Sequence, residues 1–164
     1  MKTLFIGGIK SGKSRLAEAY ILEQSKQKPY YLATTEFIDK EMALRIAEHQ
    51  QRRQDRFIIL EEPVHLRKAL SECSSPVLIE CVSMWLNNMI FYKQPDELIF
   101  QELEAALLMP LDLVFVQNEV GLGIVPDNAL ARKYIDISGK CAQMLAAHCD
   151  MVFYCCAGLS LTLK

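Results

Sequence analysis

The chain has 164 residues, of which 51% are hydrophobic and 23% charged, and its formal net charge at pH 7 is −2. This size suits one domain with a hydrophobic core, and the composition excludes an intrinsically disordered protein. The weak charge gives no support to nonspecific nucleic-acid binding, and no apolar run is long enough to span a bilayer.

Strand-like and helix-like stretches alternate along the whole chain. Apolar runs bounded by turn residues predict strands at residues 3–6, 30–34, 57–60, 76–81, 111–117, 151–155 and 159–163. The stretches between them predict helices at 14–23, 39–53, 64–71, 82–91, 95–108 and from Asp127 or Asn128 to about residue 148. Apolar strands separated by helices are typical of a mostly parallel sheet covered on both faces. We therefore predict an α/β fold, a three-layer sandwich in a single domain over residues 1–164.

The loop after the first predicted strand carries the strongest motif. Residues 7–14 read G-G-I-K-S-G-K-S, which matches the phosphate-binding loop (P-loop) pattern G-x-x-x-x-G-K-S. Glycines let backbone N–H groups approach a polyphosphate, the lysine can reach the outer phosphates, and the serine hydroxyl can bind Mg²⁺ at a helix start. The motif predicts a P-loop NTPase-like fold with a nucleotide site at Gly7, Gly8, Ile9, Lys10, Ser11, Gly12, Lys13 and Ser14. The alternative is a glycine-rich turn that only caps a helix.

Polar residues close two of the other predicted strands. Glu80 ends the strand at 76–81, where P-loop proteins usually place an acidic residue that holds Mg²⁺, so Ser14 and Glu80 are the predicted metal ligands. Asn118 and Glu119 begin a glycine-rich loop, and loops at the carboxyl ends of parallel strands line the ligand crevice. We therefore name both as candidates for substrate contact. The alternatives are an ordinary carboxylate at a strand end and a purely structural turn.

The helix expected at residues 39–53 has an unusual polar flank. Arg45, His49 and either Arg52 or Arg53 share one side of it. The arginines would keep the imidazole neutral and would offset the charge of a bound phosphate, and neutral imidazole can attack phosphorus. Spacing alone nevertheless favours an ordinary solvated face with charge pairs along the helix.

Six cysteines occur, and none belongs to a C-x-x-C pair, so we expect no zinc site. Beside an intracellular nucleotide site, free and buried thiols are the expectation.

Taken together, these residues resemble the bifunctional adenosylcobinamide kinase/adenosylcobinamide-phosphate guanylyltransferase family of cobalamin synthesis. The resemblance covers essentially the whole chain and includes the P-loop, Y-L-A-T-T at 31–35, E-E-P at 61–63, E-C at 80–81 and L-A-R at 130–132. Its most specific parts are R-I-x-x-H at 45–49 and N-E-V-G-L-G-I-V-P at 118–126. Two departures are Lys10, where the family commonly has Arg, and Phe57, where it often has Trp.

The resemblance implies a role for His49, which would attack the α-phosphate of GTP and become guanylylated. It further implies that the nucleotide site includes Ala33, Thr34, Thr35, Gln50, Gln51, Arg52, Arg53, Glu61 and Glu80. The implied substrates are GTP and ATP with Mg²⁺, adenosylcobinamide and its phosphate. The implied state is a cytoplasmic homo-oligomer, a trimer. Two alternatives stay open: a small-molecule P-loop kinase in which His49 is idle, and a nucleotide-dependent binding module.

Overall fold

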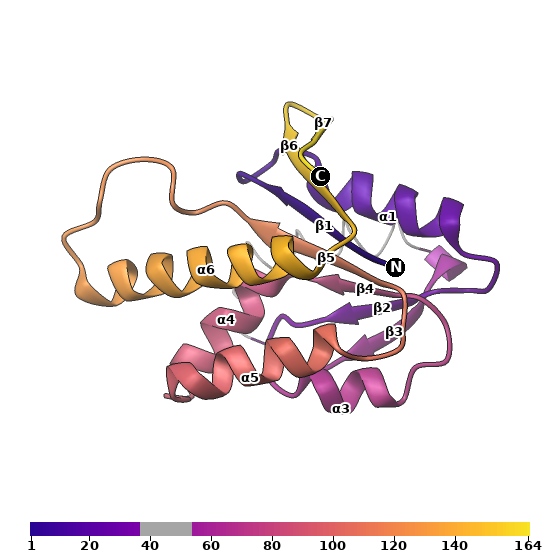
Figure 1. The fold of residues 1–164 in the computed structure, drawn as a ribbon, viewed down its shortest axis with the longest axis horizontal. Coiled ribbons are helices and arrows are strands. Elements are labelled where there is room, and N and C mark those ends of the chain that lie inside the picture. The colour runs from indigo at the N-terminus through magenta and orange to yellow at the C-terminus, as the bar shows by residue number, and fades with distance from the viewer. Residues whose placement is uncertain (37–53) are drawn as a thin grey trace.

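The structure is a computed structural model that describes residues 1–36 and 54–164 (Figure 1). Within these residues seven strands form one sheet in the order β3-β2-β4-β5-β1-β6-β7. The strands are β1 (Lys2–Gly7), β2 (Tyr30–Ala33), β3 (Ile58–Glu61), β4 (Val77–Glu80), β5 (Leu113–Asn118), β6 (Met151–Cys156) and β7 (Leu159–Thr162). Neighbouring strands of this described sheet pair in parallel, except that β7 runs antiparallel to β6.

Helices cover both faces of the sheet, so the predicted three-layer α/β sandwich is confirmed. The described helices are α1 (Lys13–Gln24), α3 (Leu66–Ser71), α4 (Val82–Phe91), α5 (Asp96–Leu107), α6 (Ala129–His148) and the short 3-10 helix η1 (Gln54–Arg56). Among them, α1 packs on one face and α3 to α6 pack on the other (Figure 1). In the part of the chain that the structure describes, no helix is both long enough and apolar enough to cross a membrane.

The strands have apolar side chains on both faces because each face is covered. In β5, Phe115 belongs to the core beneath α3 to α6, while Val114 and Val116 face the core beneath α1. The larger core includes the fully buried Trp85 of α4. This arrangement explains why the central strands read as continuous apolar runs rather than as alternating patterns.

The elements begin and end within about two residues of the predicted bounds. The sequence left open whether Asp127 or Asn128 starts the long helix. In the structure Asn128 is the N-cap of α6, and its side chain accepts a hydrogen bond of 3.0 Å from the Ala131 amide. The helix expected at 39–53 lies outside the described residues.

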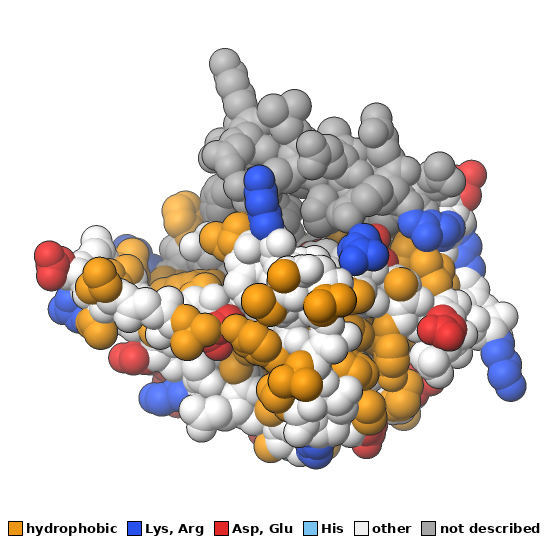
Figure 2. All heavy atoms as spheres, turned by 90° about the horizontal axis from the view of Figure 1, so that it is seen from above, with side chains coloured by type: hydrophobic (Ala, Val, Ile, Leu, Met, Phe, Trp, Pro, Cys, Tyr) orange, Lys and Arg blue, Asp and Glu red, His pale blue; other side chains and the backbone are white. Residues whose placement is uncertain are grey.

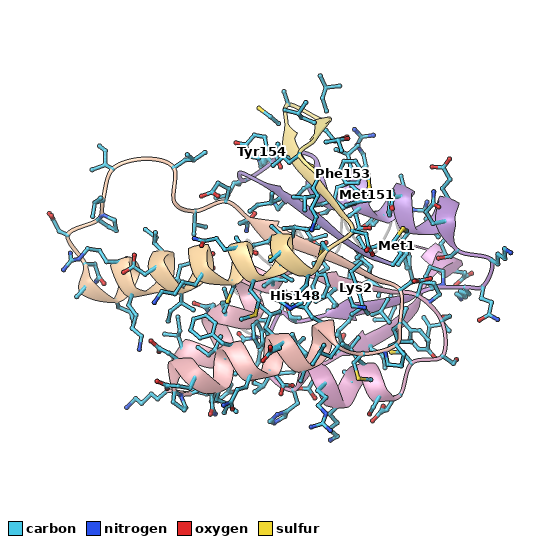
Figure 3. All side chains as sticks on the ribbon, viewed as in Figure 1. Met1, Lys2, His148, Met151, Phe153 and Tyr154 are labelled. Atoms are coloured by element: carbon cyan, nitrogen blue, oxygen red, sulfur yellow. The ribbon has the colours of Figure 1, made fainter. Side chains whose placement is uncertain are left out.

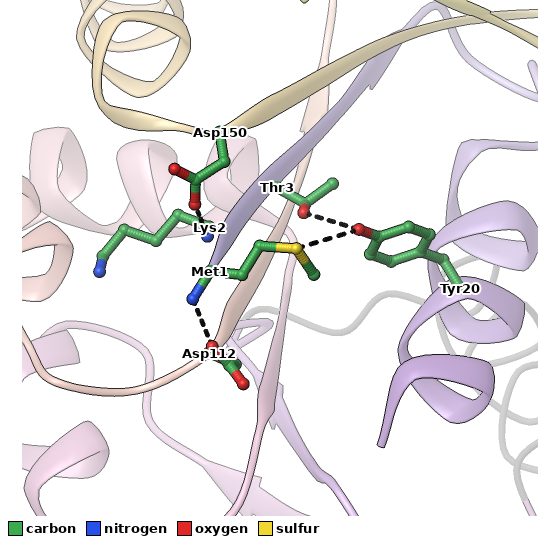
Figure 4. Close-up of polar contacts among 6 residues, drawn as sticks. All are labelled: Met1, Lys2, Thr3, Tyr20, Asp112 and Asp150. Atoms are coloured by element: carbon green, nitrogen blue, oxygen red, sulfur yellow. Dashed lines mark hydrogen bonds and ion pairs between the residues drawn. The ribbon is translucent and has the colours of Figure 1, made fainter.

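The amino edge of the sheet is tied together by polar contacts (Figures 3 and 4). The amino group of Met1 bonds to the Asp112 carboxylate just before β5, and the Lys2 amide donates to the Asp150 carboxylate just before β6 at 2.7 Å. Tyr20 of α1 and Thr3 lie within hydrogen-bond distance, at 3.3 Å. These contacts fix β1 between its neighbours, and so they fix the direction in which the loop after β1 leaves the sheet.

The opposite edge of the sheet gathers the ends of the parallel strands. The register pairs Gly7 of β1 with Asn118 of β5, and it pairs Ala33 of β2 with both Glu61 of β3 and Glu80 of β4. The P-loop, Glu61, Glu80 and the loop after β5 therefore leave the sheet at one edge, which we call the carboxyl edge. In open α/β sheets this edge is where ligands bind.

Candidate active site

The P-loop joins β1 to α1 in a tight turn at the carboxyl edge. The Ser11 amide donates to the Gly8 carbonyl at 3.2 Å, and Lys10 and Gly12 adopt left-handed backbone angles, with φ of 57° and 90°. The Lys13 side chain is only 8% exposed, and its Nζ donates to the Gly8 carbonyl at 3.2 Å. The lysine charge is therefore held over the loop, where the outer phosphates of a nucleotide would lie.

Two glycines of the loop are packed against the end of the chain. A Cβ at Gly7 would lie 2.3 Å from the Cys155 carbonyl oxygen, and a Cβ at Gly12 would lie 2.9 Å from the Gly158 Cα. The Gly158 amide donates to the Ser11 carbonyl at 2.9 Å. The turn between β6 and β7 thus packs against the P-loop and stabilises it. The sequence analysis assigned these glycines to phosphate contact and did not predict their packing against the β6–β7 turn. The only sequence signal for this packing was Gly158, which lies between the apolar runs at 151–155 and 159–163.

The two predicted metal ligands lie side by side. The Ser14 hydroxyl, in the first turn of α1, donates to the Glu80 carboxylate oxygen Oε1 at 2.7 Å. A hydroxyl and a carboxylate are oxygen ligands of the kind that Mg²⁺ prefers, and Mg²⁺ is usually bound by one or two protein groups together with substrate phosphates. The donor set therefore fits Mg²⁺ bound beside the P-loop by Ser14 and Glu80.

A second feature of the loop suits an anion. The Ser11 side chain is 7% exposed, and its hydroxyl has no hydrogen-bond partner among the described residues. A buried hydroxyl without a partner is costly unless a ligand satisfies it. Ser11 therefore offers a donor within the same loop whose lysine and glycines suit a polyphosphate.

Thr34, just after β2, bonds to the backbone that follows β4. It is fully buried, and its hydroxyl donates to the Cys81 carbonyl at 2.8 Å and accepts from the Cys81 amide at 3.0 Å. The Thr34 carbonyl accepts from the Asn88 side chain of α4 at 2.7 Å. In this structure the hydroxyl fixes the backbone that carries Glu80, and sequence reasoning identified neither this role nor that of Asn88. The flanking residues Ala33 and Thr35 are half-buried at the same edge.

The remaining candidates differ in where they point. Glu61 is exposed at the end of β3, beside Ala33. The backbone amide of Asn118 donates to the Ser83 hydroxyl at 2.8 Å, and the backbone amide of Glu119 donates to the Gly7 carbonyl at 2.9 Å. The Glu119 carboxylate accepts a hydrogen bond from the Gly121 backbone amide at 2.5 Å. This bond stabilises the turn, which is the structural role given above as the alternative to substrate contact. His49, Arg45, Gln50, Gln51, Arg52 and Arg53 lie outside the described residues.

The cysteines are free, but they differ in burial. All six lie in the described residues and are free, and no cluster of potential metal ligands occurs there. Cys141, Cys149 and Cys155 are buried, and Cys73 and Cys81 are half-buried. Cys156 is exposed because it ends β6 at the hairpin turn, so the expectation of burial was wrong for it. Burial raises the pKa of Cys81 and the neighbouring Glu80 raises it further, which keeps this thiol protonated beside the site.

A glycine-rich loop between a parallel strand and a helix, a lysine held over it and a serine–carboxylate pair define a P-loop nucleoside-triphosphate-binding protein. The fold is similar to two solved structures at 12% identity. A KaiC-like protein from Pyrococcus horikoshii matches with a TM-score of 0.51 over 93% of this chain and 69% of that one. An ATPase of a bacterial type III secretion system matches with a TM-score of 0.53 over 98% of this chain and 56% of that one.

Sequence comparison narrows this class. Residues 3–163 match the model of the family described as cobinamide kinase / cobinamide phosphate guanyltransferase. The bifunctional adenosylcobalamin biosynthesis protein CobP of Pseudomonas aeruginosa is 39% identical over 170 residues, covering 100% of this chain and 98% of its own length. Its counterpart CobU of Escherichia coli is 37% identical over 183 residues, with both chains covered completely. The chain belongs to the cobinamide kinase / cobinamide phosphate guanyltransferase family and is an enzyme of that family.

Proposed function

We propose that this chain acts as one catalytic domain over residues 1–164, which phosphorylates adenosylcobinamide and then transfers GMP from GTP to the product. The result is adenosylcobinamide-GDP, an intermediate of cobalamin nucleotide-loop assembly. The observation that carries the proposal is the Ser14–Glu80 hydrogen bond of 2.7 Å beside the buried Lys13, because this combination binds a triphosphate for reaction at phosphorus. The family membership supplies the acceptor and both activities.

In the kinase step the protein's contribution is alignment and charge compensation. The loop amides and the Ser11 hydroxyl bind the phosphates of ATP or GTP. The Lys13 ammonium group gives up its hydrogen bond to the Gly8 carbonyl and binds the outer phosphates instead. Ser14 and Glu80 would hold Mg²⁺, which would supply further positive charge where negative charge builds up. The hydroxyl of the aminopropanol arm attacks the γ-phosphorus, and the bond from this phosphorus to the β–γ bridging oxygen breaks. The nucleoside diphosphate leaves, and the hydroxyl proton passes to solvent water.

In the guanylyl step a covalent intermediate divides one displacement into two. The neutral imidazole of His49 attacks the α-phosphorus of GTP, a nitrogen–phosphorus bond forms and pyrophosphate leaves. A phosphate oxygen of adenosylcobinamide phosphate then attacks the same phosphorus, and the histidine is released. Arg45, Arg52 and Arg53 are the proposed cations for this step. Because these residues lie outside the described part, the step rests on the family resemblance and the motif at 45–49.

We also infer the surroundings of the nucleotide from the family resemblance. Ala33, Thr34, Thr35, Glu61, Gln50 and Gln51 complete the nucleotide site. From their place after β5, we infer that Asn118 and Glu119 lie toward the acceptor. The protein works as a homotrimer in the cytoplasm, and sedimentation of the purified protein tests the oligomeric state directly.

The test follows two isotopic labels into the corrinoid product. Adenosylcobinamide, Mg²⁺ and GTP labelled at the α- or the γ-phosphate are incubated with the protein, and the corrinoids are separated. We expect both labels in adenosylcobinamide-GDP. The γ-label alone would indicate a kinase without guanylyl transfer, and nucleotide binding with neither label transferred would indicate a binding module.

Lys13→Ala provides the matched variant for this test. We expect it to lose roughly a hundredfold or more of both activities, since electrostatic stabilisation of a transferring phosphoryl group is a large term in catalysis. Lys26→Ala is the control, because Lys26 is an exposed lysine beyond the other end of α1. Near-normal GTP turnover by Lys13→Ala would contradict the assignment of the loop.

A further inference from the structure

The loop that follows β5 exposes large aliphatic side chains. Leu122, Ile124 and Val125 are 75%, 98% and 73% exposed. Figure 1 shows this loop arching beyond the carboxyl edge before α6 begins, and in Figure 2 apolar side chains lie along the arm that projects at the left. We call residues 121–125 the apolar arm. Side chains of this kind are costly to leave in water when they cluster, and such clusters often mark binding sites.

Both ends of the apolar arm are held by hydrogen bonds. On the β5 side, the Glu119 amide donates to the Gly7 carbonyl at 2.9 Å, and the Glu119 carboxylate accepts from the Gly121 amide. On the α6 side, Arg132 Nη1 donates to the carbonyls of Pro126 at 2.8 Å and Asp127 at 2.7 Å. The arm is therefore anchored to the first residue of the P-loop, and its aliphatic side chains are presented outward from that point.

We propose that the apolar arm binds the corrin ring of the acceptor, with Leu122, Ile124 and Val125 packed against a face of the macrocycle. This inference rests on the proposed function. The acceptor hydroxyl must reach the γ-phosphorus above the P-loop, so the rest of a molecule much larger than a nucleotide extends outward from the carboxyl edge. Residues 120–126 carry no charge, which suits the apolar faces of a corrin rather than a phosphate or a peptide charge.

The position of the arm distinguishes it from the other exposed aliphatic group of the molecule. Leu159, Leu161 and Leu163 lie at the β6–β7 hairpin, where they are likewise exposed, and apolar side chains gather over this hairpin in Figure 2. The turn of that hairpin also bonds to the P-loop, through Gly158 and Ser11, but its leucines lie on or just after β7, the outermost strand of the described sheet. The arm instead extends beyond the carboxyl edge, starting two residues after Glu119, which bonds to Gly7. The hairpin leucines therefore provide a matched control of similar chemistry and exposure.

The test measures kinase kinetics with adenosylcobinamide for Ile124→Ser, for Leu122→Ser and for the control Leu161→Ser. Each side chain of the arm is exposed, so the variants should unfold at the wild-type midpoint. Losing one aliphatic contact to the ring is expected to raise the KM for adenosylcobinamide roughly five- to tenfold. We expect unchanged GTP affinity and unchanged guanylylation of the protein without acceptor. Leu161→Ser should have the wild-type KM.

Three results would overturn the inference. An unchanged KM in both arm variants would show that the arm does not contact the corrin. A fall in the sedimenting mass of the arm variants would identify the arm as a contact between subunits instead. If the wild-type protein transfers neither label to adenosylcobinamide, the proposed function itself fails, and the inference fails with it.

Discussion

At the scale of single residues, the candidate site depends on how Glu80 is held. Its carboxylate meets the Ser14 hydroxyl only because β4 ends level with the start of α1. The backbone at that point is fixed by Thr34, whose hydroxyl both donates to and accepts from Cys81. Asn88 in turn bonds to the carbonyls of Thr34 and Pro63, at 2.7 Å and 3.0 Å. A buried polar chain therefore leads from α4 to the predicted metal ligand.

Replacing the Thr34 hydroxyl should disturb both stability and the Mg²⁺ dependence of turnover. Thr34→Val keeps the shape but leaves the Cys81 amide without its partner, which should cost about 1–3 kcal/mol in the free energy of unfolding. Because Glu80 is no longer fixed, the Mg²⁺ concentration for half-maximal activity should rise. Urea unfolding and Mg²⁺ titration measure the two effects. Thr34→Ser should restore both, and a valine variant as stable and as active as wild type would refute the role.

At the scale of elements, the P-loop and the β6–β7 hairpin act as one unit. The Gly158 amide bonds to the Ser11 carbonyl, the Gly158 carbonyl accepts from Arg15 at 3.3 Å, and Gly158 has a φ of 81° that favours glycine. The hairpin lies at the far end of the chain yet supports the loop that would bind the phosphates. We infer that changes in this turn reach the nucleotide site through the backbone.

Gly158→Ala should therefore weaken nucleotide binding although it lies outside the P-loop motif. The left-handed backbone should cost about 1–2 kcal/mol with a side chain present. We expect weaker GTP binding by calorimetry and a lower unfolding midpoint. Gly139→Ala is the control: Gly139 lies inside α6 with open space around its Cα, so alanine should leave binding unchanged and raise stability by up to about 1 kcal/mol. Equal effects of the two substitutions would show that the turn has no special role.

The elements themselves could be predicted from the sequence because their signals are local. The apolar run at 111–117 and the cap at Asn128 each depend on neighbouring residues, and the structure contains both β5 and α6. The P-loop was predictable for the same reason. The Thr34–Cys81 contact joins residues 47 positions apart, and it exists only because β2 pairs with β4. Resemblance therefore assigned Thr34 to the nucleotide site, while the pairing that turns its hydroxyl toward Cys81 could not be read from the chain.

At the scale of the whole molecule, burial of ionisable groups limits stability in alkali. Desolvation raises the pKa of Cys141 to about 12, and it likewise raises the pKa of Cys149 to about 12, from an ordinary value of 9.0. Because the folded-state pKa is the higher one, these thiols stay protonated in the folded protein while the unfolded chain loses its protons. Stability is therefore complete below about pH 9 and falls as the pH rises toward 12.

We expect the free energy of unfolding to drop by at least about 2–3 kcal/mol between about pH 8 and pH 10, since Cys141 and Cys149 each contribute about 1.4 kcal/mol over this whole range. Urea unfolding at the two pH values measures the drop. Cys141→Ala should reduce this drop by about 1.4 kcal/mol, whereas Cys156→Ser, at the exposed cysteine, should leave it unchanged. A drop that is the same in all three proteins would show that the buried thiols are not its cause.

At the scale of the whole molecule, the described residues gather a candidate triphosphate site at the carboxyl edge of the sheet. The described residues supply the site, from the Ser14–Glu80 pair to the P-loop with its Lys13. The predicted nucleophile, His49, is known only from the motif and the family. We therefore infer that the guanylyl group of a GTP bound at the P-loop is transferred to this histidine.

The most direct test is mass spectrometry of the protein after incubation with GTP and Mg²⁺ without acceptor. The account predicts an added guanylyl group, stable in base and labile in acid, on the peptide that contains His49. His49→Ala should carry none, and the exposed-histidine control His65→Ala should carry the wild-type amount. Absence of the adduct from the wild-type protein, or equal labelling of His49→Ala, would contradict the account.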